Sequence, residues 1–269
     1  MDLHAEADAA SSEELFLTSF EGEYDDEKPW EAVRALRLRG GEEVFRLAVT
    51  YSKSEYSLCR ARALDVLAQL KAGSPASERP HLDERVTIAV GSLDDPSALV
   101  KYSAAWALAH IGGDLAISAL IGLRGYSDPE VRQAVAFGVA GSERPDAIST
   151  LIALTSDEDD EVRNWATFGL GNAGADSGPP ARLGTLDSME IRNALRKRLA
   201  DPFADARDEA TWGLARRKEP AGLRLLLERL NSTEWTSGDE MAAAEAIGVD
   251  YETPVEALRA GLVTLLSKE

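Results

Sequence analysis

The chain has 269 residues, of which 47 are acidic and 29 are basic, so its formal net charge at pH 7 is −18. This charge argues against nucleic acid, whose affinity for proteins comes mainly from neutralised phosphates. It also argues against anionic membranes and favours a basic protein partner. No run of eighteen apolar residues predicts a membrane-spanning helix. Cys59 is the single cysteine, so an internal disulfide is excluded and a cytoplasmic location is expected.

Residues 1–27 form the first predicted element. They contain ten acidic residues and no lysine or arginine. Leu15, Phe16, Leu17 and Phe20 predict a short helix that caps the array that follows, and an acidic recognition arm is the alternative. The first sixteen residues have neither a basic nor an apolar signal region, so we expect no secretory signal in them.

Residues 28–269 repeat one pattern. The stretches 97–112, 128–143 and 159–174 align without gaps, and their basic residues Lys101, Arg132 and Arg163 lie 31 positions apart. Arg207 occupies the same position in a fourth copy at 203–218, after 13 additional residues. Weaker copies occur at 55–70 and 236–251. Six positions after the basic residue stand small residues, including Gly138, Gly169 and Gly213, which predict close helix packing.

Second helical patterns lie between these copies, such as LDERVTIAVGSL, AISTLIALT and AGLRLLLERL. Their apolar residues recur at steps of three and four, and Asp-Pro pairs mark the turns. Such helix pairs must cover each other's apolar faces, so we predict a single all-α solenoid over 28–269. The segment 171–188 is rich in Gly, Ser and Pro and is predicted to be a loop insertion.

A pair length of about 31 residues, with D-P-x-V-R opening the second helix, resembles the HEAT-like repeat of PBS-lyase-type proteins. The resemblance covers residues 30–267 and implies a right-handed α-solenoid of about six to seven HEAT-like helix pairs. The segments EVRNWATFGLG and IRNALRKRLADPFADARDEATWGLARRKEP resemble the YibA-like immunity proteins encoded beside Rhs toxin genes. This second resemblance implies a non-catalytic protein that binds and neutralises a cognate toxin domain.

The resemblance also implies a structural role for the repeated arginines. In such repeats the arginine ties one pair to the next through an acidic residue in the preceding turn. We therefore predict that Arg132, Arg163 and Arg207 are structural. The available acidic partners are Asp128, Asp159 and Asp205.

Four aromatic residues stand five positions after the basic residue of successive copies. This aromatic column consists of Trp106, Phe137, Phe168 and Trp212, and Asp65 holds the same position in an earlier copy. One turn earlier stand Tyr102, Gln133, Asn164 and Asp208. Second helices line the concave face of such a solenoid, so both sets are predicted to bind a partner, as aromatic residues in polar surroundings often do. Packing of the rings on each other is the alternative.

No catalytic or metal-binding arrangement is predicted. The three histidines, His4, His81 and His110, lack metal-ligand spacing, and no nucleophile with a partner base is recognisable. The G-x-G-x-x-G match at 169–174 follows a helical pattern instead of a strand, so it does not indicate a dinucleotide site. We expect no cofactor, no metal and no enzymatic activity.

The sequence thus predicts a cytoplasmic module that binds a basic toxin domain and inhibits it by occlusion. We expect the free protein to be a monomer, without nucleic-acid or membrane partners. A general scaffold or assembly factor that binds a peptide or helix in its groove is the main alternative. A tetrapyrrole lyase or chaperone and a DNA-glycosylase-like protein remain further alternatives.

Overall fold

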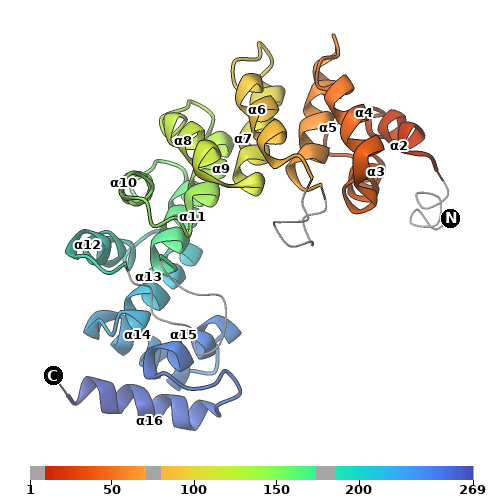
Figure 1. Ribbon diagram of the computed structural model, residues 1–269. Coiled ribbons are helices and arrows are strands. Elements are labelled where there is room, and N and C mark those ends of the chain that lie inside the picture. Colours follow the sequence, from red (N-terminus) through yellow and green to blue (C-terminus); the bar gives the residue numbers. More distant parts are fainter. Residues whose placement is uncertain (1–9, 71–79, 174–185, 269) are drawn as a thin grey trace. The chain divides into compact units, whose positions relative to one another are not determined.

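The computed structural model describes residues 10–70, 80–173 and 186–268 (Figure 1). These residues form fifteen helices and no strand, which confirms the predicted all-α class. The chain divides into two compact units, Met1–Gly138 and Val139–Glu269, and each is described by itself. Among the described residues, no helix is both long and apolar enough to cross a membrane.

The first unit is built from helix pairs (Figure 1). Within it, α3 packs on α5 and α5 on α7, while α2 packs on α4 and α6 on α8. Successive pairs therefore stack first helix on first helix and second helix on second helix, as in α-solenoids. The helices are α2 (Ser12–Ser19), α3 (Glu27–Arg39), α4 (Gly41–Tyr51), α5 (Ser57–Ala68), α6 (Leu82–Ser92), α7 (Ala98–Ile111), α8 (Asp114–Gly122) and α9 (Pro129–Val139), whose last residue begins the second unit.

The N-terminal pair closes the end of the first core. Helix α2 begins with a capping box, in which the Ser11 Oγ accepts from the backbone N of Glu14 at 3.2 Å and a Glu14 carboxylate oxygen accepts from the Ser11 backbone N at 2.7 Å. Its Leu15 and Phe16 are buried in the same cluster as Leu36 of α3. The described part of the predicted 1–27 element therefore packs on the array, and residues 1–9 lie outside the described residues.

The second unit continues the same pairing. Helix α11 packs on α13 and α13 on α15, and α16 packs on α14 and α15 at the end of the chain. The predicted 171–188 insertion separates α11 from α12, and its residues 174–185 lie outside the described residues. The helices are α10 (Pro145–Leu154), α11 (Asp160–Gly171), α12 (Met189–Arg198), α13 (Ala204–Arg216), α14 (Pro220–Asn231), α15 (Ser237–Ile247) and α16 (Val255–Leu266).

Small residues allow the second helices to approach closely. A Cβ atom added to Gly138 of α9 would lie 2.7 Å from the Cα of Ala109 on α7. A Cβ added to Gly213 of α13 would lie 2.7 Å from the Cα of Gly171 on α11. Both distances are shorter than carbon atoms tolerate, so these positions accept no larger residue without movement of a helix. The close packing predicted from the sequence is confirmed at both positions.

Candidate protein-binding surface

The repeated arginines bind the turn that precedes their own helix, and each does so in the same way. One guanidinium nitrogen, Nη1, donates to the carbonyl oxygens six and five residues upstream, at distances between 2.7 and 3.1 Å. This clasp orders the turn, because it satisfies two carbonyl groups that the helix leaves unpaired. It is formed by Arg60, Arg132, Arg163 and Arg207.

Two of these arginines also reach the turn of the next pair. The Nε and Nη2 atoms of Arg163 donate to the two carboxylate oxygens of Asp201 at 2.9 and 3.0 Å. Arg60 holds Asp95 in the same bidentate way, at 2.8 Å for both bonds. Asp201 precedes α13 and is 3% exposed, so the ion pair joins α11 to the following pair inside the protein. Paired charges of this kind lose little on burial.

The acidic partners differ from those predicted. Asp159 caps α11, its Oδ1 accepting from the backbone N of Val162 at 3.0 Å, while Arg163 binds Asp201 and Asp160. Likewise, an Asp128 carboxylate oxygen accepts from the backbone N of Glu130 at 3.0 Å. Of the acidic residues available, Asp159 is thus not the one that Arg163 binds, because the arginine extends toward the next turn and Asp159 caps its own helix.

The same correction applies to the fourth copy. Arg207 binds the carbonyl oxygens of Asp201 and Pro202. Asp205 is exposed in the first turn of α13, where a negative charge suits the helix dipole. The expected pairing of Arg207 with Asp205 is thus replaced by the clasp on its own turn.

In the first unit, two rungs of the aromatic column pack together. The ring centroids of Trp106 on α7 and Phe137 on α9 are 5.7 Å apart, and His110 lies 5.9 and 5.3 Å from them. Tyr102 lies 6.4 Å from Trp106, and both Tyr102 and Gln133 are half-buried. The rings keep part of their surface exposed. The Nε1 of Trp106 has no hydrogen-bond partner among the described residues.

Two further aromatic residues extend this cluster and were missed in the sequence. Tyr24 lies 6.1 Å from Tyr102 and 5.5 Å from Trp30 of α3. The Arg62 guanidinium carbon lies 4.4 Å from the centroid of the Tyr24 ring and 4.7 Å from that of Trp30. Both aromatic residues precede the first recognisable copy of the repeat, so the register that revealed the column could not reach them.

Asp65 is buried beneath this cluster. It is 4% exposed, and the Tyr24 hydroxyl donates to its Oδ2 at 3.0 Å. Burial raises the pKa of Asp65 to about 6, although Arg37 and Arg62 act to lower it. Contrary to the expectation, Asp65 is not accessible to a partner, because the connection between α2 and α3 covers its carboxylate.

In the second unit, Phe168 is the accessible rung. Its side chain is 37% exposed, and its ring meets Trp165 edge to face at 5.7 Å between centroids. Asn164, one turn earlier, is half-buried, and its Oδ1 has no hydrogen-bond partner among the described residues. Its Nδ2 donates to a Glu161 carboxylate oxygen at 3.4 Å. The exposed part of the Phe168 ring is suited to contact with a partner, whereas the Asn164 Oδ1 atom is itself buried.

Trp212 is instead anchored in the C-terminal packing. Its Nε1 donates to the Oδ1 of Asp239 on α15 at 2.8 Å, and its ring packs against the core cluster formed by α14, α15 and α16. Asp208 is half-buried and pairs with Arg229. These two residues combine a structural role with partial exposure.

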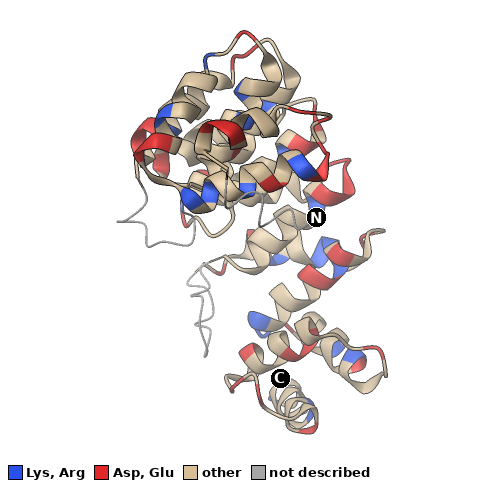
Figure 2. Cartoon of the chain, turned by 90° about the vertical axis from the view of Figure 1, so that its right-hand side faces the viewer, with Lys and Arg blue, Asp and Glu red and all other residues tan. Residues whose placement is uncertain are grey.

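Carboxylates surround the first-unit cluster. Burial, together with the charges of Glu130, Asp65 and Asp25, raises the pKa of the Tyr102 hydroxyl to about 12. Of these carboxylates, Glu130 and Asp25 are exposed. Figure 2 shows acidic residues spread over the helices and turns, with basic residues among them. The surroundings of the rings therefore favour a cationic neighbour.

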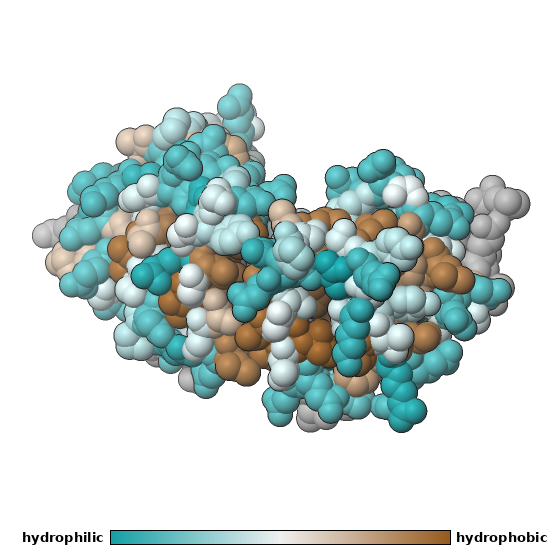
Figure 3. Space-filling view, turned by 90° about the horizontal axis from the view of Figure 1, so that it is seen from above, coloured by the Kyte–Doolittle hydropathy of each residue, from teal (hydrophilic) through white to brown (hydrophobic). Residues whose placement is uncertain are grey.

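The described residues contain no group of three or more His, Cys, Asp or Glu side chains placed to hold a metal ion. Some large apolar side chains reach the surface, and Figure 3 shows brown apolar residues gathered in groups between teal polar ones on one face. The arrangement offers contact surface and hydrogen-bond acceptors, which are the means of binding a protein.

Two stretches of the chain match known repeat families. Residues 100–123 match the PBS lyase HEAT-like repeat, and residues 122–182 match HEAT repeats. Residues 100–182 contain HEAT-like repeats. The clasps of Arg132 and Arg163 and the close contact of Gly138 lie within these matched residues. No curated protein sequence matches the chain.

Solved structures share the fold. YibA of Escherichia coli is similar with a TM-score of 0.70 and 22% identity, covering 99% of this chain and 96% of its own. The archaeal HEAT-like repeats protein from Thermococcus onnurineus NA1 gives 0.54 at 13% identity, covering 96% and 98%. A chain of the Kap95p–RanGDP complex gives 0.63 at 12% identity, covering 98% of this chain and 41% of that one. These similarities establish the α-solenoid fold.

Proposed function

We propose that this protein is a non-catalytic binding module whose partner docks on the aromatic column. The observation that carries the proposal is the set of partly exposed aromatic rings on second helices. Trp106 and Phe137 supply it in the first unit, and Phe168 supplies it in the second. Aromatic side chains in such surroundings carry much of the energy of protein interfaces.

The proposed partner is basic. The chain carries a net charge of −18, and exposed carboxylates of Asp25 and Glu130 lie near the Tyr102 and Trp106 rings. Complementary charge accelerates association and rejects acidic competitors. The resemblance to YibA-like proteins encoded beside Rhs toxin genes supports the more specific form of the proposal. In that form the protein is an immunity protein that occludes a toxin domain.

We expect a toxin domain to be encoded beside this gene, and the test uses that domain, purified separately. Wild-type protein should bind it and neutralise it. Phe168→Ala should weaken binding by at least about 30-fold, as expected of a hot-spot aromatic side chain. Val263→Ala removes an apolar side chain that is 53% exposed on α16 and should change binding less than about threefold.

Circular dichroism must show that both variants fold. If Phe168→Ala and Val263→Ala weaken binding equally, the aromatic column is not part of the interface. Binding without neutralisation would favour a general scaffold over an immunity protein, and absence of binding to the neighbouring domain would overturn the toxin assignment.

A further inference from the structure

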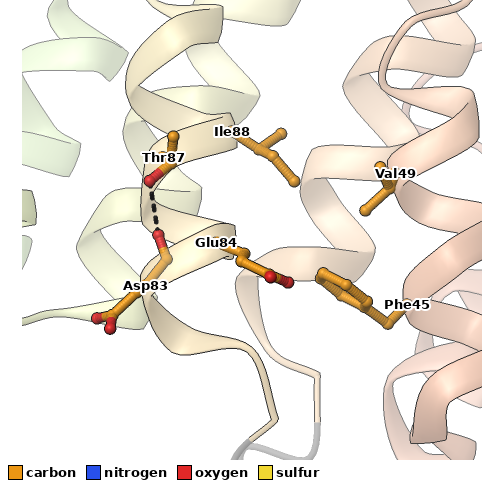
Figure 4. A pocket seen from close by; sticks show the side chains of 6 residues that line it. All are labelled: Phe45, Val49, Asp83, Glu84, Thr87 and Ile88. Atoms are coloured by element: carbon orange, nitrogen blue, oxygen red, sulfur yellow. Dashed lines mark hydrogen bonds between the residues drawn. The ribbon is translucent and has the colours of Figure 1, made fainter.

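A second apolar site lies between two first helices of the first unit. Helices α4 and α6 line an open pocket of about 440 Å³. Figure 4 shows Phe45 and Val49 on α4 facing Ile88 and Glu84 on α6 across the space between them. None of the residues of the aromatic column lines it. The remaining lining residues are Asp83 and Thr87.

A histidine next to the pocket connects the two helices that line it. The His81 ring stacks on Phe45 with centroids 3.8 Å apart and an interplanar angle of 5°. Its Nε2 lies 2.9 Å from a carboxylate oxygen of Glu42 on α4, and its Nδ1 lies 3.1 Å from one of Glu84 on α6. The residue adopts a left-handed backbone at φ +56° just before α6. His81 therefore bridges the two helices beside the pocket. It does so in a left-handed backbone conformation that residues other than glycine seldom adopt.

The lining combines an apolar floor with an acidic edge. Phe45, Val49 and Ile88 supply the floor, and the exposed Glu84 carboxylate points across the space toward Phe45, while the Asp83 carboxylate points away from α4 (Figure 4). Among the described residues that line the pocket there is no lysine or arginine. The volume lies within the range of small-ligand pockets and accommodates one large apolar side chain with its neighbours. The chemistry selects an occupant that is apolar at its tip and positively charged beside it.

We propose that this pocket is a second docking site, which receives a basic segment of a protein partner. The segment inserts a phenylalanine or leucine side chain between α4 and α6 and places a lysine or arginine against Glu84. A second copy of this chain is a poor occupant, because two molecules of charge −18 repel each other. The proposal extends the proposed function to a second contact, but it does not require the aromatic column to be an interface.

The first test is a titration of the whole protein, with labelled methyl groups on Ile and Val, followed by NMR. The probes are the capped tripeptides Lys-Phe-Lys, Glu-Phe-Glu and Lys-Ala-Lys. The first should shift the Ile88 and Val49 methyl signals at millimolar concentration. The second should bind at least about fivefold more weakly, and the third should leave these signals in place. Equal binding of the acidic peptide, or no shift with Lys-Phe-Lys, would overturn the proposal.

A matched pair of variants locates the effect. Thr87→Phe places a ring at the pocket mouth and should abolish the shifts caused by Lys-Phe-Lys. Thr264→Phe is the control, since both threonines are exposed on helices and donate to the carbonyl four residues upstream, at 2.8 and 2.9 Å. The control should bind as wild type does.

Phe168→Ala separates this site from the proposed function. It should leave the tripeptide titration unchanged, whatever its effect on a toxin domain. Loss of the tripeptide shifts in Thr264→Phe or Phe168→Ala as well as in Thr87→Phe would show that the probe binds elsewhere, and the pocket assignment would fail.

Discussion

Individual carboxylates in this protein differ sharply in whether their surroundings favour the charged or the neutral form. Asp201 is buried with two arginines, whereas Glu209 on α13 lies partly buried without a hydrogen bond among the described residues. Burial raises the pKa of Glu209 to about 7, the nearby Arg216 opposes the rise, and Asp208 adds to it. The folded protein therefore favours the neutral form of Glu209.

This preference predicts a pH-dependent gain from Glu209→Gln. The folded-state pKa is raised, so the contribution of Glu209 to stability is complete below about pH 4.5 and is lost as the pH rises through about 7. At pH 8 the variant should be more stable than wild type by about 2 kcal/mol, and at pH 4 the two should be nearly equal. Urea unfolding at both pH values measures the difference.

Glu228→Gln serves as the control, because Glu228 is exposed on α14. It should change the free energy of unfolding by less than about 0.5 kcal/mol at either pH. A gain from Glu209→Gln that is the same at pH 4 and pH 8 would argue against a buried ionised carboxylate.

Single residues also show where sequence reasoning reached its limit. The aromatic column was recognised because the repeat places its members in one register. That register could not show that the Tyr24 segment covers Asp65, since Tyr24 lies outside every recognisable copy. It also could not show that Trp212 is held by Asp239, a residue of the next pair. Contacts between pairs depend on three-dimensional packing, which the spacing of residues does not contain.

At the scale of elements, the helices and their order were predictable, because apolar residues at steps of three and four dictate amphipathic helices. The pair α2 and α3 was only partly recognised, since it lacks the basic residue of the repeat. The sequence predicted that an arginine and an acidic residue join successive pairs, but it did not indicate that Asp201 is the acidic residue. Asp201 accepts from Arg163 and Arg198, and its Oδ1 also accepts from the backbone N of Phe203 at 3.0 Å.

This junction predicts a large loss of stability from Asp201→Ala. Burial alone would raise the pKa of Asp201, but hydrogen bonds from Arg163 and the Phe203 backbone bring it below its usual value. Removing the carboxylate leaves Arg163 without its buried partner, so the free energy of unfolding at pH 7 should fall by about 3 kcal/mol. Amide exchange should accelerate first in α11 and α13.

The depressed pKa gives this prediction a pH signature. The stabilisation by Asp201 is fully present above its ordinary pKa of about 3.8 and is lost as the pH falls through its lower folded-state pKa, so the difference between wild type and variant should shrink in acid. Asp205→Ala alters an exposed carboxylate at the start of the same α13 and should cost less than about 1 kcal/mol. Equal losses from both substitutions would contradict a special role for the buried junction.

At the scale of the whole molecule, charge is the dominant property. A net charge of −18 opposes self-association and attracts basic partners over distances of about 10 Å at 0.1 M salt. The aromatic rings and the pocket between α4 and α6 act only after contact, because burial of apolar surface is a short-range effect. Attraction and recognition are thus supplied by different residues.

This division predicts how salt affects complex formation. Raising the salt concentration from 50 to 500 mM should lower the association rate with a basic partner by about tenfold or more, while the dissociation rate changes less than about threefold. Surface plasmon resonance with the immobilised toxin domain measures both rates. A salt effect confined to the dissociation rate would show instead that the decisive charges lie inside the interface.

The clasp formed by Arg60, Arg132, Arg163 and Arg207 has a consequence for how such a chain can change over generations. Each of these arginines fixes a turn encoded only five and six positions before it. A duplicated stretch of about 31 residues would therefore carry both the turn and the side chain that shapes it. A gene of this kind can lengthen or shorten by whole copies. Each new copy can then acquire different surface residues while it keeps the arginine that orders its turn.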